Sequence, residues 1–293
     1  MKASFGEKIF YAINMIILGV IGITCFLPLL HITAVSLSDY DSVLSGHVTL
    51  FPKGFNFTSY IKFFESGRAG DAVLNSIKLM VVGVPISMVM TILAAYPLSR
   101  KYFFLRRHVS LALVFTMMFG AGTIPMFLLI YYLGMMNTYF AIWIPGCIVT
   151  FYVFIMKSFF ENLPEELFEA AKMDGCGEFR LVLQIVLPLS MSVIATILLF
   201  YLVANWNTFT PVLFYIQDPD KFNLPVLVQN MIRSSELIQE MNLNSNGQDY
   251  SSMMTPESVR SAGVIILLLP MLAAYPFLQK YFIKGVMIGA IKG

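Results

Sequence analysis

The chain has 293 residues, of which 58% are hydrophobic and only 12% are charged, and it holds 26 Phe, 14 Tyr and 2 Trp residues. The surface of a water-soluble protein needs roughly 25–35% charged residues, so this composition excludes a soluble globule and indicates that lipid is the main solvent. The net charge of +2 is too small to indicate a nucleic-acid partner. Cys25, Cys147 and Cys176 form no CxxC pair and are expected to be small apolar fillers.

Uncharged segments of the chain predict where it crosses a membrane. They cover 9–38, 79–99, 108–156, 181–217 and 261–279. About 20 residues of helix cross a hydrocarbon core of ~30 Å, so four of these segments are single spans. The segment over 108–156 would be ~74 Å long as one helix and is expected to form two. A Gly and an Asn-Thr pair favour a turn between them at Leu133-Gly134-Met135-Met136-Asn137-Thr138.

The sequence thus predicts an all-α integral membrane protein, with residues 1–293 forming a single transmembrane domain of six transmembrane helices. The predicted spans are about 11–37, 73–98, 109–132, 138–157, 182–204 and 261–281. The first span is longer than the ~7–15 apolar residues of a signal peptide, so we expect a retained helix.

Basic residues predict the orientation of these spans. The loop over 99–108 holds Arg100, Lys101, Arg106 and Arg107 without any acidic residue, whereas the turn over 133–138 holds no charge. The positive-inside rule therefore places both termini in the cytoplasm. The connections over 38–71 and 205–260 then face outward, and 158–181 faces the cytoplasm. The polar stretch 242–252 in the second outer connection is expected to be mobile.

The cytoplasmic connection is predicted to contain a short helix over 164–174. Pro164 suits the first helical turn, where Glu165 and Glu166 complement the positive helix end. Gly175 can take the left-handed conformation that ends a helix. The apolar face of this helix needs a covering partner, which is either the protein's own helix ends or another subunit. Its residues are Leu167, Phe168, Ala170 and Ala171.

The spacing in this connection resembles a known signature. Glu169-Ala170-Ala171, then Gly175 after three residues, then Ile185-x-Leu187-Pro188 after nine more, follow the pattern EAA-x3-G-x9-I-x-L-P. This is similar to the signature of the membrane subunits of bacterial ATP-binding-cassette (ABC) importers, whose coupling helix sits in a cleft of a cytosolic ATPase subunit. The resemblance implies type I ABC importer architecture with a cytoplasmic coupling helix. It also implies ATPase docking through Glu169, Ala170, Ala171, Asp174 and Gly175.

Three further segments resemble sugar-importer permeases. Asn205-Trp206-Asn207-Thr208-Phe209-Thr210-Pro211 resembles their Trp-Asn-x-Phe-x-x-Pro segment, and the turn over 133–138 resembles their Leu-Gly-Leu-x-Asn-Thr turn with Met replacing Leu. The ending from Lys284-Gly285 to Lys292-Gly293 is similar to that of the maltose-transporter-type second permease, and the branch most resembled is that of Gram-positive oligosaccharide permeases. The resemblance implies a bacterial cell membrane protein with a distinct second permease, two ATPase subunits that use ATP and Mg, and an extracellular sugar-binding protein. This chain itself is expected to bind no cofactor.

Five residues near the end of the fifth predicted span are expected to lie on the path of the substrate. They are Phe200, Tyr201, Asn205, Trp206 and Asn207. Aromatic faces stack on the C–H faces of sugar rings, and Asn both donates to and accepts from hydroxyls. The alternative for Trp206 is a place in the interfacial aromatic belt. The Asn-Trp-Asn segment follows Pro188 by ~25–28 Å of helix, which places it in the outer half of the bilayer.

The sequence offers no catalytic or metal site. It has no Walker sequence G-x-x-x-x-G-K-[ST], so it cannot hydrolyse ATP by that route, and no zinc pattern accompanies His31. A membrane-embedded enzyme is one alternative function, but no triad of acids, His and nucleophile appears. A permease for a polyamine or phosphate is the other. Such a permease should offer charge opposite to its substrate, whereas here only Lys78 lies within a span and is expected to snorkel outward.

Overall fold

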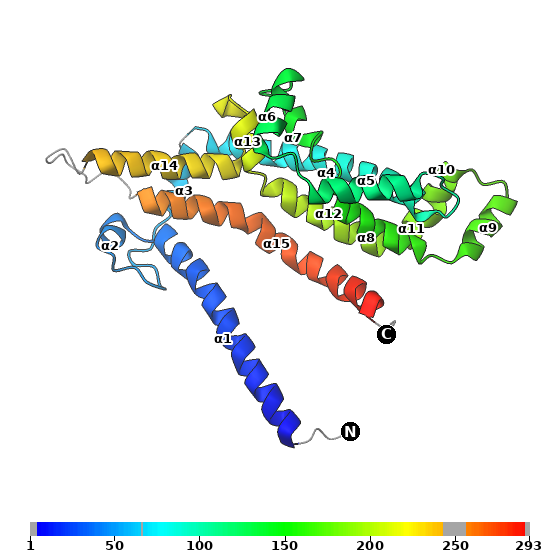
Figure 1. Ribbon diagram of the computed structural model, residues 1–293. Helices are drawn as coiled ribbons and strands as arrows, with labels where there is room; N and C mark the ends of the chain where they lie inside the picture. Colours follow the sequence, from blue (N-terminus) through cyan, green and yellow to red (C-terminus); the bar gives the residue numbers. More distant parts are fainter. Residues whose placement is uncertain (1–4, 66, 243–255, 291–293) are drawn as a thin grey trace. The chain divides into compact units, whose positions relative to one another are not determined.

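The computed structural model describes residues 5–65, 67–242 and 256–290, and every regular element among them is a helix (Figure 1). In lipid, a chain must satisfy its backbone N–H and C=O groups internally, and helices do so within one segment. The all-α prediction is confirmed for this part of the chain. The residues fall into two compact units, Met1–Gly70 with Leu227–Pro270, and Asp71–Val226 with Met271–Gly293. That 1–293 acts as one domain stays a prediction.

The first unit is built from five helices or parts of helices. They are α1(Phe5–Ser36), α2(Tyr40–Leu44), α3(Thr58–Glu65), most of α14(Leu224–Asn242) and the first part of α15(Pro256–Ala290). Phe63 of α3 is fully buried, and a Cβ on Gly263 of α15 would lie only 2.9 Å from its ring. The absence of a side chain at Gly263 therefore lets α15 approach α3 closely. Residues 243–252 of the stretch expected to be mobile lie outside the described residues.

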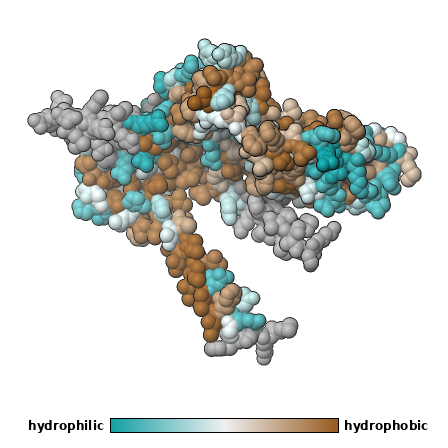
Figure 2. Space-filling view, viewed as in Figure 1, coloured by the Kyte–Doolittle hydropathy of each residue, from teal (hydrophilic) through white to brown (hydrophobic). Residues whose placement is uncertain are grey.

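Helix α1 carries apolar side chains around its circumference, and Figure 2 shows the hydrophobic colour over most of its visible face, with hydrophilic patches toward the N-terminal end. Large exposed side chains on it include Phe10, Met15, Ile21 and Phe26. A helix that is hydrophobic on all sides is stable only against lipid or another apolar surface. By length and composition, α1 and α4(Ala69–Ser99) can each cross a membrane alone, which agrees with the predicted helices over 11–37 and 73–98.

The second unit contains the remaining helices. They are α4, α5(Arg106–Met118), α6(Thr123–Tyr132), α7(Phe140–Trp143), α8(Thr150–Glu161), α9(Glu165–Met173), α10(Glu178–Leu181), the π-helical turn η1(Val182–Val186), α11(Leu187–Leu189), α12(Met191–Trp206), α13(Thr210–Tyr215) and the 3-10 turn η2(Pro219–Lys221). Their core is formed by side chains of α4, α8, α9, α10 and α12, including Leu98, Met156, Phe160, Leu181 and Ile197.

The span predicted over 109–132 is sharply bent in the structure. Helices α5 and α6 meet at 113°, and the chain between them runs from Phe119 to Gly122. Gly122 has a φ of +80°, which a residue with a side chain rarely adopts. Two glycines and a nearby proline, in Gly120-Ala121-Gly122-Thr123-Ile124-Pro125, are the sequence signal for this bend. Helices α5 and α6 are long and apolar enough to cross a membrane only if the two bent helices together form one span.

The predicted helices over 138–157 and 182–204 are also interrupted. Between α7 and α8 the chain contains Pro145-Gly146, two residues that disfavour a continuous helix. Helix α12 lies at 86° to the helical segment before it, with the break at Ser190. Pro188 has no N–H to bond the preceding turn, and the widened π-helical turn η1 lies just before it. Uninterrupted uncharged sequence did not reveal these bends.

The predicted turn over 133–138 is confirmed. Gly134 has a φ of +67°, and the amide of Met135 donates to the carbonyl of Ile130 at 3.1 Å, which closes α6. Asn137 then adopts a φ of +57°. Its side-chain oxygen accepts from the amide of Asp218 at 3.1 Å, so this turn also holds the segment after α13.

Candidate functional site

The helix predicted over 164–174 is present as α9(Glu165–Met173). Pro164 precedes it with an extended ψ of 129° instead of lying in its first turn. At the other end, Gly175 has a φ of +72°. Its amide donates to the carbonyl of Lys172 at 3.0 Å, and the amide of Cys176 donates to that of Ala171 at 2.9 Å. These two bonds form a Schellman motif, so the glycine of the signature ends the helix as its backbone freedom predicts.

The two sides of α9 have different environments. Phe168 and Ala171 are buried in the core of the second unit, against the ends of its other helices. Leu167, Ala170 and Met173 lie on the opposite side and are exposed, with Met173 exposed to 84%. The protein's own helix ends therefore cover only part of the apolar surface of this helix. One face is covered by the protein itself, and the other is left uncovered.

The five residues expected to dock an ATPase are divided between these faces. Glu169, Ala170, Asp174 and Gly175 are exposed, whereas Ala171 is buried. The small side chain at Ala171 therefore lets α9 approach its own subunit, whereas Ala170 lies on the exposed side. Glu169 forms no ion pair with any residue that the structure describes.

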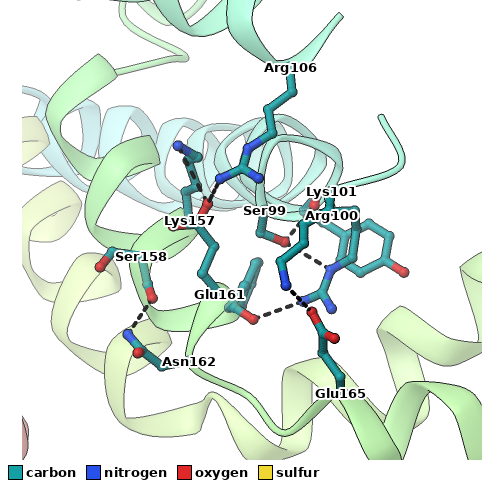
Figure 3. A network of polar contacts seen from close by, with 11 residues as sticks. Ser99, Arg100, Lys101, Arg106, Lys157, Ser158, Glu161, Asn162 and Glu165 are labelled. Carbon is teal, nitrogen blue, oxygen red and sulfur yellow. Dashed lines mark hydrogen bonds and ion pairs between the residues drawn. The ribbon is translucent and has the colours of Figure 1, made fainter. Parts of the chain in front are cut away.

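A polar network lies beside α9, around a cavity of about 380 Å³ (Figure 3). Lys101 contacts Glu165 with Nζ 2.8 Å from Oε1, and this hydrogen bond lowers the pKa of the Glu165 carboxyl. Arg106 pairs with Glu161, and the Nζ of Lys157 lies 3.6 Å from the same carboxylate. These pairs connect the loop after α4 to the end of α8 and the start of α9. The exposed Lys101–Glu165 pair contributes little stability, whereas the Arg106–Glu161 pair is partly buried.

A second set of contacts joins α4 to the segment after α9. The hydroxyl of Tyr96 donates to the carboxylate of Glu178, and the Nζ of Lys172 lies 3.2 Å from the other oxygen of that carboxylate. The same Lys172 lies 4.4 Å from the centre of the Tyr102 ring. The sequence does not predict these contacts, because no local spacing signals a pairing between residues 96 and 178.

Two of the substrate-path candidates, Phe200 and Tyr201, pack on one tyrosine of α8. Phe200 stacks on Tyr152 with ring centres 5.4 Å apart, and Tyr201 meets it edge-on at 4.9 Å. Tyr201 is buried, and its hydroxyl lies 2.7 Å from that of Thr91 in α4. The amide of Val149 donates to the same hydroxyl at 3.3 Å. Tyr201 thus joins helices within the subunit.

The other three candidates lie at the end of α12. Trp206 is only 4% exposed, so neither face of its ring is open to a ligand. Asn205 is half-buried and donates to the carbonyl of Tyr201 at 2.9 Å. Asn207 is exposed and donates to the carbonyl of Val203 at 3.0 Å. Of the three residues, Asn207 offers the most open polar group.

Residues 54–288 match the family described as "Binding-protein-dependent transport system inner membrane component". The chain belongs to this family. The permease is 36% identical over 284 residues to the "Polygalacturonan/rhamnogalacturonan transport system permease protein YtcP" of Bacillus subtilis (strain 168), covering 96% of this chain and 98% of that protein. It is 37% identical over 287 residues to "Protein LplC" of the same organism, covering 98% and 96%.

A solved structure supports the same assignment. The permease is similar to a chain in the crystal structure of a bacterial ABC transporter involved in the import of the acidic polysaccharide alginate. The TM-score is 0.86 at 27% identity, and the match covers 96% of this chain and 99% of that chain. The resemblance to importer permeases is confirmed, and the protein is a multi-pass membrane transport subunit and not an enzyme.

Proposed function

We propose that this permease is the transmembrane subunit of an ATP-driven oligosaccharide importer, and that it docks on a separate ATPase through α9. The observation that carries this proposal is the exposed face of α9, where Glu169, Ala170, Asp174 and Gly175 of the signature lie. The permease then contains half of the translocation path. Six spans, the coupling role of α9 and cytoplasmic termini are parts of this proposal.

The chemistry of α9 fits a protein partner on the cytoplasmic side. Leu167, Ala170 and Met173 form an exposed apolar strip, and the carboxylate of Glu169 beside it is not paired with a described residue. Apolar side chains that face water cost free energy unless another surface covers them. A cleft with an apolar floor and a basic rim would cover the strip and pair with the carboxylate.

The assembly we propose contains a distinct second permease, two copies of the ATPase and an extracellular sugar-binding protein. The family description refers to a binding protein, which supports the last of these partners. The apolar circumference of α1 supports burial against lipid or a second membrane subunit. ATP and Mg²⁺ are used by the ATPase, and this chain binds neither. A functional transporter that contains this chain as its only membrane subunit would contradict the assembly.

The substrate class we propose is an oligosaccharide. The named relatives support it, since one is a polygalacturonan/rhamnogalacturonan permease and another, from Halalkalibacterium halodurans, is described as an arabinooligosaccharides permease at 26% identity over 275 residues. Within this chain, Asn207 supplies an exposed amide suited to sugar hydroxyls, and Phe200 supplies an aromatic ring beside Tyr152.

Reconstitution of the whole complex tests the proposal. ATP-dependent uptake into proteoliposomes is measured with an oligogalacturonate, an arabino-oligosaccharide, spermidine and inorganic phosphate. The extracellular binding protein of the complex is present in the outer solution in every measurement. We expect uptake of one of the two sugars and none of the other two solutes. Uptake of spermidine or phosphate without either sugar would show that the permease serves another solute class.

A further inference from the structure

A single arginine, Arg100, links the end of α4 to α8 and to α9. Arg100 directly follows α4 and is only 8% exposed. Its Nη2 donates a hydrogen bond of 2.8 Å to the carbonyl of Phe160, near the end of α8. Its Cζ lies 3.8 Å from the centre of the Phe168 ring in α9. Phe160 and Phe168 flank the turn that leads into α9, so one side chain fixes both sides of that turn to α4.

Neutral groups contact the Arg100 cation directly, and the carboxylates of Glu178 and Glu165 favour its charged form from further away. Among the described residues none forms an ion pair with it, and its Nε donates to Ser99 at 3.0 Å (Figure 3). The carbonyls at the end of α8 carry the negative end of a helix dipole, and the face of Phe168 is negative as well. Burial lowers the pKa of the guanidinium. A buried charge tolerates little displacement of the groups that replace water around it, so these contacts are stiff.

The C-terminal end of α9 is also linked to α4. Tyr96, one turn before Arg100, donates to Glu178, which follows α9 and also pairs with Lys172. The last turn of α4 therefore contacts the chain both before and after α9. At the near end, Lys101 just after α4 pairs with Glu165 in the first turn of α9.

We propose that Arg100 is a positioning residue that makes α9 and the cytoplasmic end of α4 move as one rigid body. A displacement of α9 by the ATPase would then reach α4 directly, together with the end of α8. This inference rests on the proposed coupling role of α9. It assigns a role in coupling to the loop over 99–108, which lies outside the EAA-x3-G-x9-I-x-L-P signature.

A distance measurement on the whole complex tests the rigid body without any transported solute. Spin labels are placed at Leu93→Cys in α4 and Glu166→Cys in α9, two exposed positions outside the apolar strip proposed for docking, after Cys25, Cys147 and Cys176 are replaced by Ser. Double electron–electron resonance compares the nucleotide-free complex with the complex trapped by ATP, Mg²⁺ and vanadate. We expect one narrow distance distribution that trapping leaves unchanged, and a broadened or displaced one after Arg100→Met.

Two variants make the result specific. Arg107→Met removes an exposed arginine of the same loop and should leave the distribution narrow. Phe168→Leu keeps apolar packing but removes the ring face under the guanidinium, and it should broaden the distribution even where Arg100→Met fails to fold. A wild-type distance that changes on trapping, or a distribution unaffected by both Arg100→Met and Phe168→Leu, would overturn the proposal.

A functional readout separates positioning from simple folding. With the ATPase still co-purified, Arg100→Met should lower the stimulation of ATP hydrolysis by the loaded binding protein about tenfold, and Arg100→Lys should fall between it and wild type. A loss only in proportion to the amount of complex recovered would mean that Arg100 is merely structural. If Glu169→Lys leaves stimulation unchanged as well, the coupling role of α9 itself fails. If Glu169→Lys abolishes it and Arg100→Met does not, only this inference fails.

Discussion

The phenolic oxygen of Tyr201 lies 2.7 Å from the hydroxyl of Thr91, and the two groups join α12 to α4. Both residues are buried. A residue whose polar group is already paired inside the subunit is a poor contact for a passing solute. The sequence predicts that Tyr201 lies on the substrate path, whereas the structure shows it packed between helices. A substitution at Tyr201 can distinguish helix packing from sugar binding.

Tyr201→Phe removes this hydroxyl while keeping the ring. Hydrogen bonds between helices in membranes are worth ~0.6 kcal/mol on average, so we expect a loss of about 1 kcal/mol with the amide of Val149 also left unpaired. The thermal midpoint of the purified complex should fall while the apparent KM for uptake stays unchanged. Tyr152→Phe is the control, because its hydroxyl forms no hydrogen bond with a described residue. A raised KM in Tyr201→Phe alone would return Tyr201 to the substrate path.

Gly175→Val tests the turn that ends α9. Gly175 has a φ of +72°, where a side chain costs roughly 1–2 kcal/mol, and a β-branched one more. We expect normal membrane insertion and loss of stimulated ATP hydrolysis, because the Schellman hydrogen bonds and the direction of the chain into α10 change. Gly177→Val is the matched control, since Gly177 has an extended φ of −71° and nothing within 4 Å of its Cβ position. Normal uptake by Gly175→Val would mean that the turn is only structural.

Glu169→Lys inverts a charge on the exposed face of α9. The variant should insert and fold normally, because Glu169 forms no ion pair with a described residue. If the partner ATPase offers a basic rim, the reversed charge should abolish stimulated hydrolysis and weaken co-purification most at low salt, where charges are least screened. Glu165→Gln, which neutralises the carboxylate one turn earlier that is already paired with Lys101, is expected to retain both. Equal behaviour of the two variants would exclude a docking role for Glu169.

Asn207→Leu and Trp206→Ala are expected to differ, although the sequence places both residues on the expected substrate path. Trp206 is buried, and truncating a buried Trp costs ~3–5 kcal/mol, so this variant should lower the yield and thermal midpoint of the complex. Asn207 is exposed, so its replacement should raise the apparent KM for the sugar at unchanged stability. Uptake normalised to complex abundance checks both. An unchanged KM in Asn207→Leu would remove this residue from the site.

The sequence by itself determined the elements whose signals are local. Uncharged segments of sufficient length predicted α1 and α4, and the turn after Leu133 followed from Gly134 and Asn137. The end of α9 followed from Gly175, whose missing side chain permits the positive φ that closes the helix. In each case the preference belongs to the backbone of a few consecutive residues, so no distant contact is needed to produce it.

Only the tertiary structure decided which side of each element is covered. Helical periodicity places Phe168 and Ala171 on one face, but it does not show that this face meets the protein's own core while Ala170 faces outward. It also gives no hint that Arg100 contacts Phe160 and Phe168, which lie 60 or more residues further along the chain. An apolar side chain has the same local preference whether lipid, its own subunit or a partner covers it. Burial depends on which distant segments the fold brings alongside.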